Sequence, residues 1–351
     1  MRAALRPTMT RMPSKLPAAV VAALCLVSAC SGGATHARSQ GSPSATPSTS
    51  ATPVVAVPAG ATRDLITGTT AISHASLVAI KVDNSPLARP YQVGLGRAAI
   101  VYQEIVEGGL TRFLAIYESD VAGPGEVGPI RSGRESDVDI LRAFGMIPVG
   151  FSGAQSGVKA IFHAAQRHGW LTDASYDVVP GAYRLGAWRR DARNFYAVPS
   201  ALASARPGNG PVDIGFRFGD PVGGVPAPSA TARFSPDTSV GLRYNATTGR
   251  YSVSQNGATT NGAAPATVII QVVSVQGSGF RDVHGLTTPR TVSTGSGKVT
   301  VLRRGASVTG TWSRKGFGAT HYKDAAGKDI VMAAGPVWVL LLPSTGSLSL
   351  G

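Results

Sequence analysis

The sequence is nearly devoid of cysteine. Of its 351 residues only Cys25 and Cys30 carry a thiol, and both precede the segments that we expect to fold. The folded part therefore has no disulfide, no cysteine nucleophile and no cysteine-ligated zinc. His163 and His168 are five residues apart, so they would point to different sides of a helix and make a poor metal pair. We predict no metal site and no cofactor.

Glutamate is scarce as well, and its distribution is uneven. The chain has five glutamates, all within one short stretch: Glu104, Glu107, Glu118, Glu126 and Glu135. Apolar, strand-like runs alternate with the charged residues of this stretch. Charged residues between such runs usually lie at strand ends, where a fold can gather them into one cleft. The sequence therefore places a candidate site within residues 80–134.

An apolar run near the start of the chain, residues 18–27, is too short to span a bilayer. It follows four basic residues, which is the layout of a signal peptide. The run leads into Leu26-Val27-Ser28-Ala29-Cys30, which resembles a bacterial lipobox. The resemblance implies cleavage before Cys30, diacylglycerol on its sulfur and an acylated new N-terminus, so the protein would be lipid-anchored on the outer face of the cytoplasmic membrane. An ordinary secretory signal with a chance cysteine is the alternative.

Basic residues outnumber acidic ones. The formal net charge is +14, and residues 1–29 hold four basic and no acidic residues, which leaves 14 − 4 = +10 for the remainder. Such a charge attracts anionic lipid, anionic wall polymer or nucleic acid. No more than two basic residues are adjacent, so solvated surfaces of an arginine-rich chain explain the excess more simply. Because an exported protein rarely meets nucleic acid, we expect none as a partner.

Composition divides the chain into segments. Residues 1–29 form the predicted lipoprotein signal peptide. Residues 30–62 are rich in Ser, Thr, Pro, Ala and Gly, cannot bury a core and are expected to form a disordered tether. Residues 63–205 alternate strand and helix patterns, and residues 206–232 form a linker rich in Pro and Gly. Residues 233–343 carry strand-like runs without an amphipathic helix, and residues 344–351 form a tail.

The apolar pattern within 63–205 predicts strands at 77–82, 98–106, 112–117 and 147–151. A Ser-x-x-Asp motif at 136–139 is typical of a helix start, and further helices are expected after residue 153 and at 199–205. Later runs at 267–275, 298–302 and 337–342 indicate strands. The predicted fold class is α+β, with an α/β sandwich on a mixed sheet followed by a smaller mainly-β domain, a sandwich or barrel.

Two sets of charged residues make up the candidate site. The acidic set, Asp83, Glu104 and Glu107, can supply the general acid and base of a hydrolase. The basic set can clamp a carboxylate or phosphate bidentately, with Asn84 and Ser132 beside it; its members are Arg89, Arg112, Arg131 and Arg134. A third interpretation is that the two sets neutralise each other in a structural ion-pair network.

Two of these arginines are assigned different roles. Arg112 lies inside a strand-like run, so we expect it to pair with Glu104 or Glu107 and to support the fold. Arg131 is followed by small residues, which leave room for an anion next to exposed backbone N–H groups. Arg131 is therefore predicted to be the free, ligand-binding arginine.

Several short blocks of the N-terminal part form a recognisable pattern: Val82-Asp83-Asn84, Ala88-Arg89-Pro90, Val106-Glu107-Gly108-Gly109-Leu110-Thr111-Arg112-Phe113 and Gly128-Pro129-Ile130-Arg131-Ser132-Gly133-Arg134. These blocks resemble the YerB-like lipoprotein family of bacterial envelope proteins, a domain-of-unknown-function family without an established reaction. Arg193-Asn194-Phe195-Tyr196 resembles a later block and adds Asn194 to the candidate ligand-binding residues. The closing motifs of the family resemble Gly295-Ser296-Gly297-Lys298, Gly310-Thr311-Trp312 and Gly335-Pro336-Val337-Trp338.

The sequence departs from the pattern of this family at two places. Arg193 stands where the family usually has a histidine, and residues 255–262 lack the aspartate that often follows the family's glycine turn. Chemistry that depends on either residue in relatives is not available to this chain in the same form.

These observations predict a noncatalytic binding or regulatory module of the cell envelope, held at the membrane by lipidated Cys30. The expected partners are the membrane and a cell-wall polymer, a peptide or an envelope protein. The alternative is an extracytoplasmic hydrolase that acts on a cell-wall component through paired carboxylates among Asp83, Glu104 and Glu107.

Overall fold

The computed structural model describes residues 62–351 except 121–122, 124, 187–193 and 283. The predicted signal peptide, Cys30 and all but the last residue of the predicted tether lie outside the described residues, and so does Arg193.

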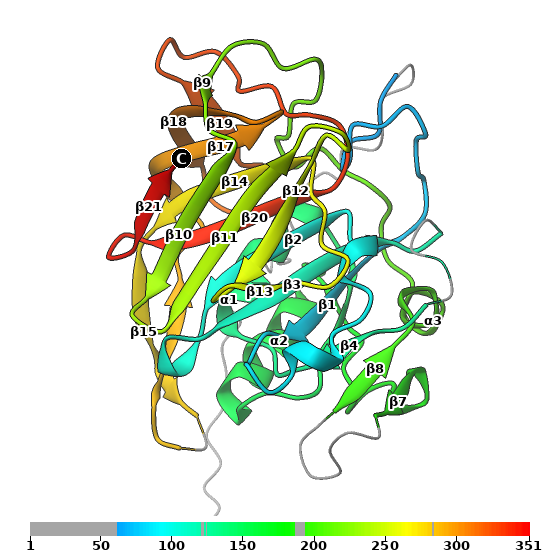
Figure 1. Cartoon of the computed structure of the whole chain (residues 1–351). Helices are drawn as coiled ribbons and strands as arrows, with labels where there is room; N and C mark the ends of the chain where they lie inside the picture. Colours follow the sequence, from blue (N-terminus) through cyan, green and yellow to red (C-terminus); the bar gives the residue numbers. More distant parts are fainter. Residues whose placement is uncertain (1–61, 121–122, 124, 187–193, 283) are drawn as a thin grey trace, which may run out of the picture. The chain divides into compact units, whose positions relative to one another are not determined.

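A mixed sheet of 14 strands runs through both halves of the described chain (Figure 1). Its main path has the order β19-β18-β17-β14-β20-β2-β3-β1-β4-β8-β7, with β5, β6 and β9 paired off this path. The strands of the N-terminal half are β1 (Leu77–Asp83), β2 (Ile100–Ile105), β3 (Thr111–Glu118), β4 (Val127–Ile130), β5 (Pro148–Gly150), β6 (Thr172–Asp173), β7 (Tyr183–Leu185) and β8 (Phe195–Ala197). Those of the C-terminal half are β9 (Val225–Pro226), β14 (Thr267–Val273), β17 (Gly295–Arg303), β18 (Ala306–Arg314), β19 (His321–Asp324) and β20 (Val337–Pro343).

The central strands are covered on both faces, which explains their nearly continuous apolar sequences. All seven residues of β1 are buried. Because side chains alternate along a strand, Leu77 and Ala79 point to one face, and Val78 and Ile80 point to the other. Each face therefore has its own hydrophobic core.

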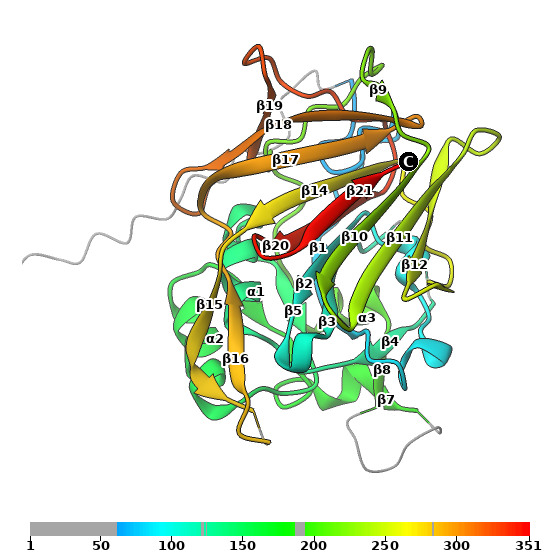
Figure 2. The same cartoon turned by 60° about the vertical axis from the view of Figure 1, so that its left-hand side comes forward.

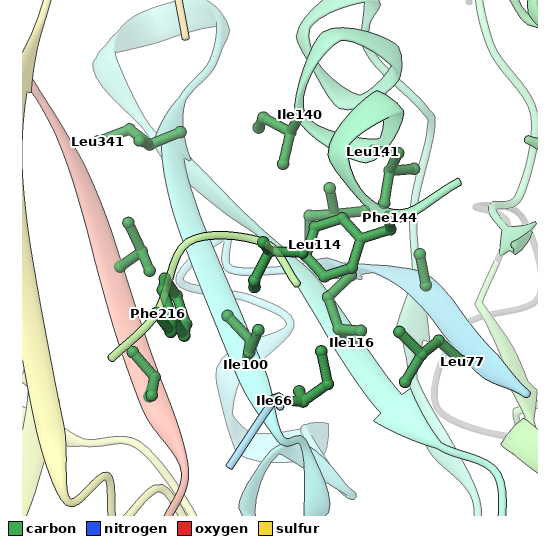
Figure 3. Close-up of a cluster of buried hydrophobic side chains, with 14 of the residues drawn as sticks. Ile66, Leu77, Ile100, Leu114, Ile116, Ile140, Leu141, Phe144, Phe216 and Leu341 are labelled. Atoms are coloured by element: carbon green, nitrogen blue, oxygen red, sulfur yellow. The ribbon is translucent and has the colours of Figure 1, made fainter. Parts of the chain in front are cut away.

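Two helices cover the first face, α1 (Glu135–Leu141) and α2 (Ser156–Arg167). Figure 3 shows Leu114 and Ile116 of β3 meeting Leu141 of α1 and the nearby Phe144, all of them buried. Short 3-10 helices connect the elements of this half: η1 (Arg89–Tyr91), η2 (Leu95–Arg97), η3 (Glu107–Gly109), η4 (Arg142–Phe144) and η5 (Pro180–Ala182). A third helix, α3 (Pro199–Ala205), packs Leu202 into the core of the opposite face.

A second sheet of five strands covers the opposite face, in the order β13-β12-β11-β10-β21. Its strands are β10 (Ser229–Ser235), β11 (Thr238–Asn245), β12 (Arg250–Gln255), β13 (Ala258–Thr259) and β21 (Ser347–Leu350). A two-stranded ribbon, β15 (Val275–Arg281) and β16 (Thr287–Thr291), leaves the main sheet and lies beside α1 and α2 (Figure 2). Gly157 in α2 permits this approach, since an added Cβ would lie 2.2 Å from the ring of Phe280.

The predicted α+β class with a mixed sheet is confirmed, but the two halves share that sheet. Strand β20 runs parallel to β14 on one side and parallel to β2 on the other. Within 206–232, expected to be a linker, Val212, Ile214 and Phe216 are buried in the helix-side core. Residues 344–351, expected to be a tail, contain β21, which pairs with β10. The domain boundaries themselves stay a prediction.

The start of α1 differs from the expected one. The backbone N–H of Arg134 donates to Asp137 Oδ2 at 2.7 Å, so the helix begins at Glu135, one residue ahead of the predicted motif. Arg134, and not Ser136, is the N-cap residue of α1. Asp137 lies three positions after Arg134 and accepts a hydrogen bond from its backbone N–H, so the Ser-x-x-Asp motif does not mark the helix start. Acidic side chains in a first turn are favourable because they interact with the free N–H groups and the helix dipole.

Glu118, at the end of β3, carries a testable pH dependence. The side chain is 5% exposed, and burial together with nearby Asp64 and Asp120 raises its pKa to about 8. Because the pKa of Glu118 is higher in the folded than in the unfolded chain, protonation of this carboxyl stabilises the fold. That stabilisation is present at low pH and is lost as pH rises through about 8. We expect Glu118→Gln to be more stable than the wild type at about pH 9 by about 1–3 kcal/mol, and similar to it near pH 5.

Denaturant unfolding at the two pH values tests this expectation. Glu126→Gln is the matched control, because Arg184 holds the pKa of that partly exposed carboxyl below its usual range. An equal pH response of the wild type and Glu118→Gln would show that Glu118 is not the group responsible.

Candidate functional site

The register of β1, β2 and β3 gathers charged residues at one end of the helix-covered face. Asp83 lies opposite Arg112 in the β1–β3 pair, and Glu104 lies opposite Arg112 in the β2–β3 pair. Residues directly opposite in antiparallel strands share a face. Lys81 precedes Asp83 by two positions and shares that face too. The apolar rows that pack on α1 and α2 therefore end in a charged row.

A cavity of about 740 Å³ opens at this charged end. Its walls come from the end of β1, the β2–β3 connection, the segment 131–134 that leads into α1, the start of α2 and the tip of the β15–β16 ribbon. Six of the predicted ligand-binding residues line it: Asp83, Glu107, Arg112, Arg131, Ser132 and Arg134. The cavity therefore brings these six residues together, and their role in binding stays a prediction.

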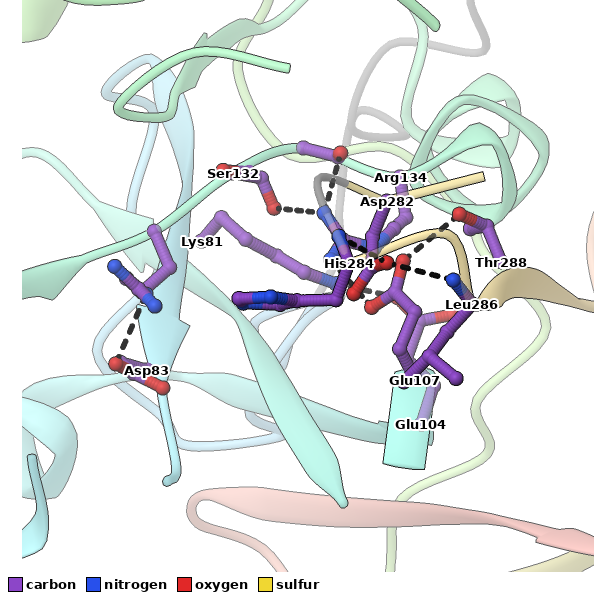
Figure 4. Close-up of polar contacts among 12 residues, drawn as sticks. Lys81, Asp83, Glu104, Glu107, Ser132, Arg134, Asp282, His284, Leu286 and Thr288 are labelled. Atoms are coloured by element: carbon purple, nitrogen blue, oxygen red, sulfur yellow. Dashed lines mark hydrogen bonds and ion pairs between the residues drawn. The ribbon is translucent and has the colours of Figure 1, made fainter. Parts of the chain in front are cut away.

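Two ion pairs occupy the cavity wall (Figure 4). Arg131 Nε lies 3.0 Å from Asp83 Oδ2, and Arg134 Nη2 lies 2.6 Å from Glu107 Oε2. Thr288 of the ribbon donates its hydroxyl to the other oxygen of Glu107 at 2.8 Å. Burial by itself would raise the pKa of Glu107, but Arg134 and Thr288 outweigh it and hold the pKa below its usual range. Glu107 is therefore a stably ionised group.

Arg112 differs from Arg131 and Arg134 because its guanidinium has no direct partner among the described residues. No hydrogen bond or ion pair joins its guanidinium to another residue in the described ranges, and Nη1 is buried without a partner there. Burial, followed by the positive charge of Arg134, lowers the pKa of Arg112 to about 10, so the group stays charged at neutral pH. A partly buried cation without a direct partner is costly, and this one lines an open cavity.

The pairing of two arginines is the reverse of the expected one, while their ligand-binding roles stay predictions. Arg131, predicted to be free, pairs with Asp83, although its side chain keeps 29% exposure and lines the cavity. Arg112 was predicted to pair with Glu104 or Glu107, but Glu104 contacts Lys81 and Glu107 pairs with Arg134. Both carboxylates thus have other cationic partners, which leaves Arg112 without one among the described residues.

A buried triad of charged residues lies away from the cavity lining. Lys81 of β1 contacts Glu104 Oε1 of β2, and its Nζ lies 2.6 Å from Asp137 Oδ1 of α1. All three side chains are at most 1% exposed. Burial raises the pKa of Asp137 to about 7. Burial also acts to raise the pKa of Glu104, but the charge and hydrogen bond of Lys81 hold it below its usual range.

Four predicted site residues do not line the cavity: Asn84, Arg89, Glu104 and Asn194. Asn84 donates to Thr111 at 2.8 Å and to Gln255 at 3.1 Å, and Arg89 donates to the backbone oxygen of Gln255 at 3.3 Å. These contacts belong to a buried polar network between the two halves. Asn194 is buried beside β8, where its backbone oxygen accepts from Gly186.

Several residues of this region were not predicted from the sequence. Lys81 is the one charged residue inside the apolar run of β1 before Asp83. A single lysine in a buried strand predicts a buried acidic partner, so the sequence could have indicated it. Asp137 was noticed only as part of a helix start. Thr288 and the other ribbon residues lie far along the chain from the site and carry no local pattern that would place them there. Their position follows only from the fold.

The described part of the chain contains neither a group of metal-binding side chains nor a membrane-spanning helix. Three or more His, Cys, Asp or Glu residues are nowhere grouped as a metal ion would require among the described residues. None of the helices within those residues is long and apolar enough to cross a membrane.

Comparison with known proteins gives consistent matches over both halves. Residues 66–211 match the family described as "Protein of unknown function (DUF3048) N-terminal domain", and residues 230–339 match the corresponding C-terminal domain. The protein described as "Putative lipoprotein YerB" from Bacillus subtilis (strain 168) is 39% identical over 105 residues, which are 30% of this chain. The match spans about a quarter of that relative, 26% of its length.

The crystal structure of the YerB protein from Bacillus subtilis has a similar fold. Its TM-score to this chain is 0.66 at 21% sequence identity, with 82% of this chain and 99% of that chain covered. At this identity the likeness concerns the fold, which spans both halves. With both domains matched in order and the fold shared, the chain belongs to the YerB-like family defined by the DUF3048 N-terminal and C-terminal domains.

Proposed function

We propose that this chain is a membrane-anchored extracytoplasmic lipoprotein that binds an anionic ligand of the cell envelope without transforming it. The observation that carries this proposal is Arg112, a charged group that lines an open cavity and has no direct partner among the described residues. Arginine presents a planar fork of donors that matches a carboxylate or a phosphate. The ligand that fits is therefore one that carries such a group.

The neighbours of Arg112 support the same ligand class. Arg131 is partly exposed and lines the same cavity, so it can add a second cationic contact. Ser132 also lines the cavity and carries a hydroxyl donor. Apolar side chains, among them Leu110, Val158 and Leu286, complete the lining and suit an organic body attached to the anion.

The hydrolase alternative has weaker support. A carboxylate pair for hydrolysis needs one group held protonated while the other stays ionised. Glu107 has a lowered pKa beside Arg134, Asp83 is paired with Arg131, and Glu104 does not line the cavity. None of these three groups has the environment of a general acid facing a substrate.

Replacing Arg112 by methionine tests the binding proposal. Methionine keeps an unbranched side chain but removes the charge and its donors. We expect inorganic phosphate or succinate, the two probes, to bind about tenfold to a hundredfold more weakly, equivalent to about 1.5–3 kcal/mol. The melting temperature should be unchanged or higher, since a partly buried cation without a partner is removed.

Isothermal titration with each probe, together with thermal melting, measures both effects. Arg243→Met is the matched control because Arg243 is exposed on β11 and does not line the cavity. If Arg112→Met weakens the binding of phosphate more than the binding of succinate, the site is assigned to phosphate groups. The converse result assigns it to carboxylates. Equal binding by Arg112→Met and the wild type would contradict the proposal, as would binding of neither probe by the wild type.

The proposed anchor is tested separately. The lipobox-like segment that ends at Cys30, together with the similarity to a protein described as a lipoprotein, supports acylation at this residue. We expect Cys30→Ala to move the protein from the membrane fraction to the soluble extracytoplasmic fraction and to abolish incorporation of labelled fatty acid. Cys25→Ala is the control and should remain anchored. Retention of Cys30→Ala with its label would refute the assignment.

A further inference from the structure

The buried triad combines an amine and two carboxyl groups in reacting distance. Lys81 comes from β1, Glu104 from β2 and Asp137 from α1, so only the folded chain brings them together. Lys81 Nζ lies 2.6 Å from Asp137 Oδ1 and also contacts Glu104 Oε1. Figure 4 shows Lys81 extended along the sheet toward Glu104. All three side chains are excluded from solvent.

The charges of this triad are unfavourable as they stand. Fully ionised, one ammonium faces two carboxylates, so a net negative charge would be buried. A proton on one carboxyl makes the triad neutral, but an ammonium and a carboxylate still remain without water. Removing paired charges from water is expensive, and the attraction within the pair does not always compensate for it.

We propose that Lys81 and Asp137 condense to a side-chain amide bond, with Glu104 as the group that carries the protons. The bond is an isopeptide that forms within the folded chain and needs no other reactant.

The step balances in atoms and charge. The Lys81 ammonium gives one proton to the Glu104 carboxylate, and the free amine attacks the carboxyl carbon of protonated Asp137. A C–N bond forms and the C–OH bond breaks. Glu104 protonates the departing hydroxyl and takes a second proton from the nitrogen. The products are a neutral amide, a neutral Glu104 carboxylic acid and one water molecule, so no oxidant or reductant is required.

The surroundings assign the two carboxyl groups to these roles. Burial raises the pKa of Asp137 to about 7, so a protonated and hence electrophilic carboxyl is accessible near neutral pH. Glu104, with its pKa held low by Lys81 against the effect of burial, is the ionised base. The backbone N–H of Arg134 donates to Asp137 Oδ2 at 2.7 Å and can stabilise the negative charge that develops there. Fixed proximity replaces the encounter of separate reactants.

The product suits the site better than the reactants do. The amide oxygen can keep the hydrogen bond from Arg134, and the amide N–H can donate to Glu104. All formal charges of the triad disappear from the interior. The bond would also close a covalent loop from residue 81 to residue 137, which holds the cavity arginines Arg112, Arg131 and Arg134. Cross-linking such a loop restricts the unfolded chain and stabilises the fold.

Tryptic peptide mapping of the full chain by mass spectrometry tests the proposal. Trypsin does not cut at an acylated lysine, so we expect a branched species in which the peptide 64–97 is joined to the peptide 135–142, lighter than their sum by one water molecule. Fragmentation should locate the junction at Lys81 and Asp137. The wild-type chain showing cleavage after Lys81 and an unmodified 135–142 peptide would overturn the proposal.

Two variants examine the mechanism. Glu104→Gln keeps the size of the side chain but cannot accept the ammonium proton, so its map should contain only the separate peptides. Circular dichroism and thermal melting establish whether this variant is folded. A folded Glu104→Gln that still forms the branched peptide would overturn the role of Glu104. Lys159→Arg, at an exposed lysine on α2, is the control and should form the branched peptide in full.

Discussion

Replacement of Lys81 by methionine is expected to lower the free energy of unfolding by about 3–5 kcal/mol. The reason is that Glu104 and Asp137 remain in a solvent-free site without the cation that faces both of them. Where Lys81 is joined to Asp137, the same substitution also removes that bond, so the sign of the effect does not change. Guanidinium unfolding near pH 8 measures the difference.

The pH dependence of this variant has a definite sign. Without Lys81, both buried carboxyls have folded-state pKa values above those of the unfolded chain, so folding favours their protonated forms. Their penalty is therefore absent below the unfolded pKa and grows as pH rises. Lys81→Met should recover much of its stability near pH 5, whereas the wild type should change less.

A matched control separates the buried cluster from an ordinary ion pair. Lys159 lies 2.5 Å from Asp177, but both side chains are well exposed, at 38% and 48%. Lys159→Met should therefore cost less than about 1 kcal/mol. The triple variant Lys81→Met/Glu104→Gln/Asp137→Asn removes every charge and should recover part of the loss. If Lys81→Met were as mild as Lys159→Met, the triad would not be the buried charge cluster described above.

The second large effect is expected at Trp338, which joins the two halves. Its side chain is 2% exposed, packs edge-on against Phe113 with ring centroids 5.2 Å apart, and donates Nε1–H to Gln103 Oε1 at 3.2 Å. Trp338→Ala leaves a large cavity and removes one of the two hydrogen bonds that Gln103 Oε1 accepts, since Gln255 Nε2 also donates to it at 3.3 Å. We therefore expect a loss of about 3–5 kcal/mol, most of it from the cavity. Because β20 pairs with both β2 and β14, the loss should reach both halves in a single transition.

Amide hydrogen exchange resolves this prediction by strand. Protection of β1 in the N-terminal half and of β17 in the C-terminal half should fall by the same factor in Trp338→Ala. Trp170→Ala is the control, because Trp170 is partly exposed and stacks on His168 at the end of α2. Loss of protection in β17 alone would show that the halves unfold independently, with a boundary within 206–232.

Local patterns were sufficient to predict the central elements. The predicted strands at 77–82, 98–106 and 112–117 correspond to β1, β2 and β3, since each contains consecutive apolar residues, as strands buried on both faces do. The predicted helix at 199–205 matches α3, where proline occupies the first turn. The clustering of glutamates also indicated the charged end of the sheet, because three strands place charged residues at the same edge.

The pairing between strands that lie far apart in the chain could not be predicted from the sequence. A strand-like run at 337–342 gives no indication that it lies between β14 and β2, because register and neighbours depend on the whole fold. Which charged residues pair with each other also depends on the whole fold. Arg112 and Arg131 both have acidic neighbours along the chain, and only the three-dimensional structure shows that Lys81 and Arg134 take Glu104 and Glu107.

The position of β20 has a consequence for how the chain reaches its final state. Strand β20 is the last part of the central sheet to be synthesised, although its neighbours β2 and β14 come much earlier. Until Val337 has emerged, both neighbours present rows of unpaired N–H and C=O groups, and exposed edges of this kind recruit strands from other chains. A nascent chain that stalls before Val337, or a product truncated there, would expose two unpaired strand edges, one on β2 and one on β14. We therefore expect truncation before Val337 to lower the solubility of the chain, because β2 and β14 would both lack the strand that pairs with them.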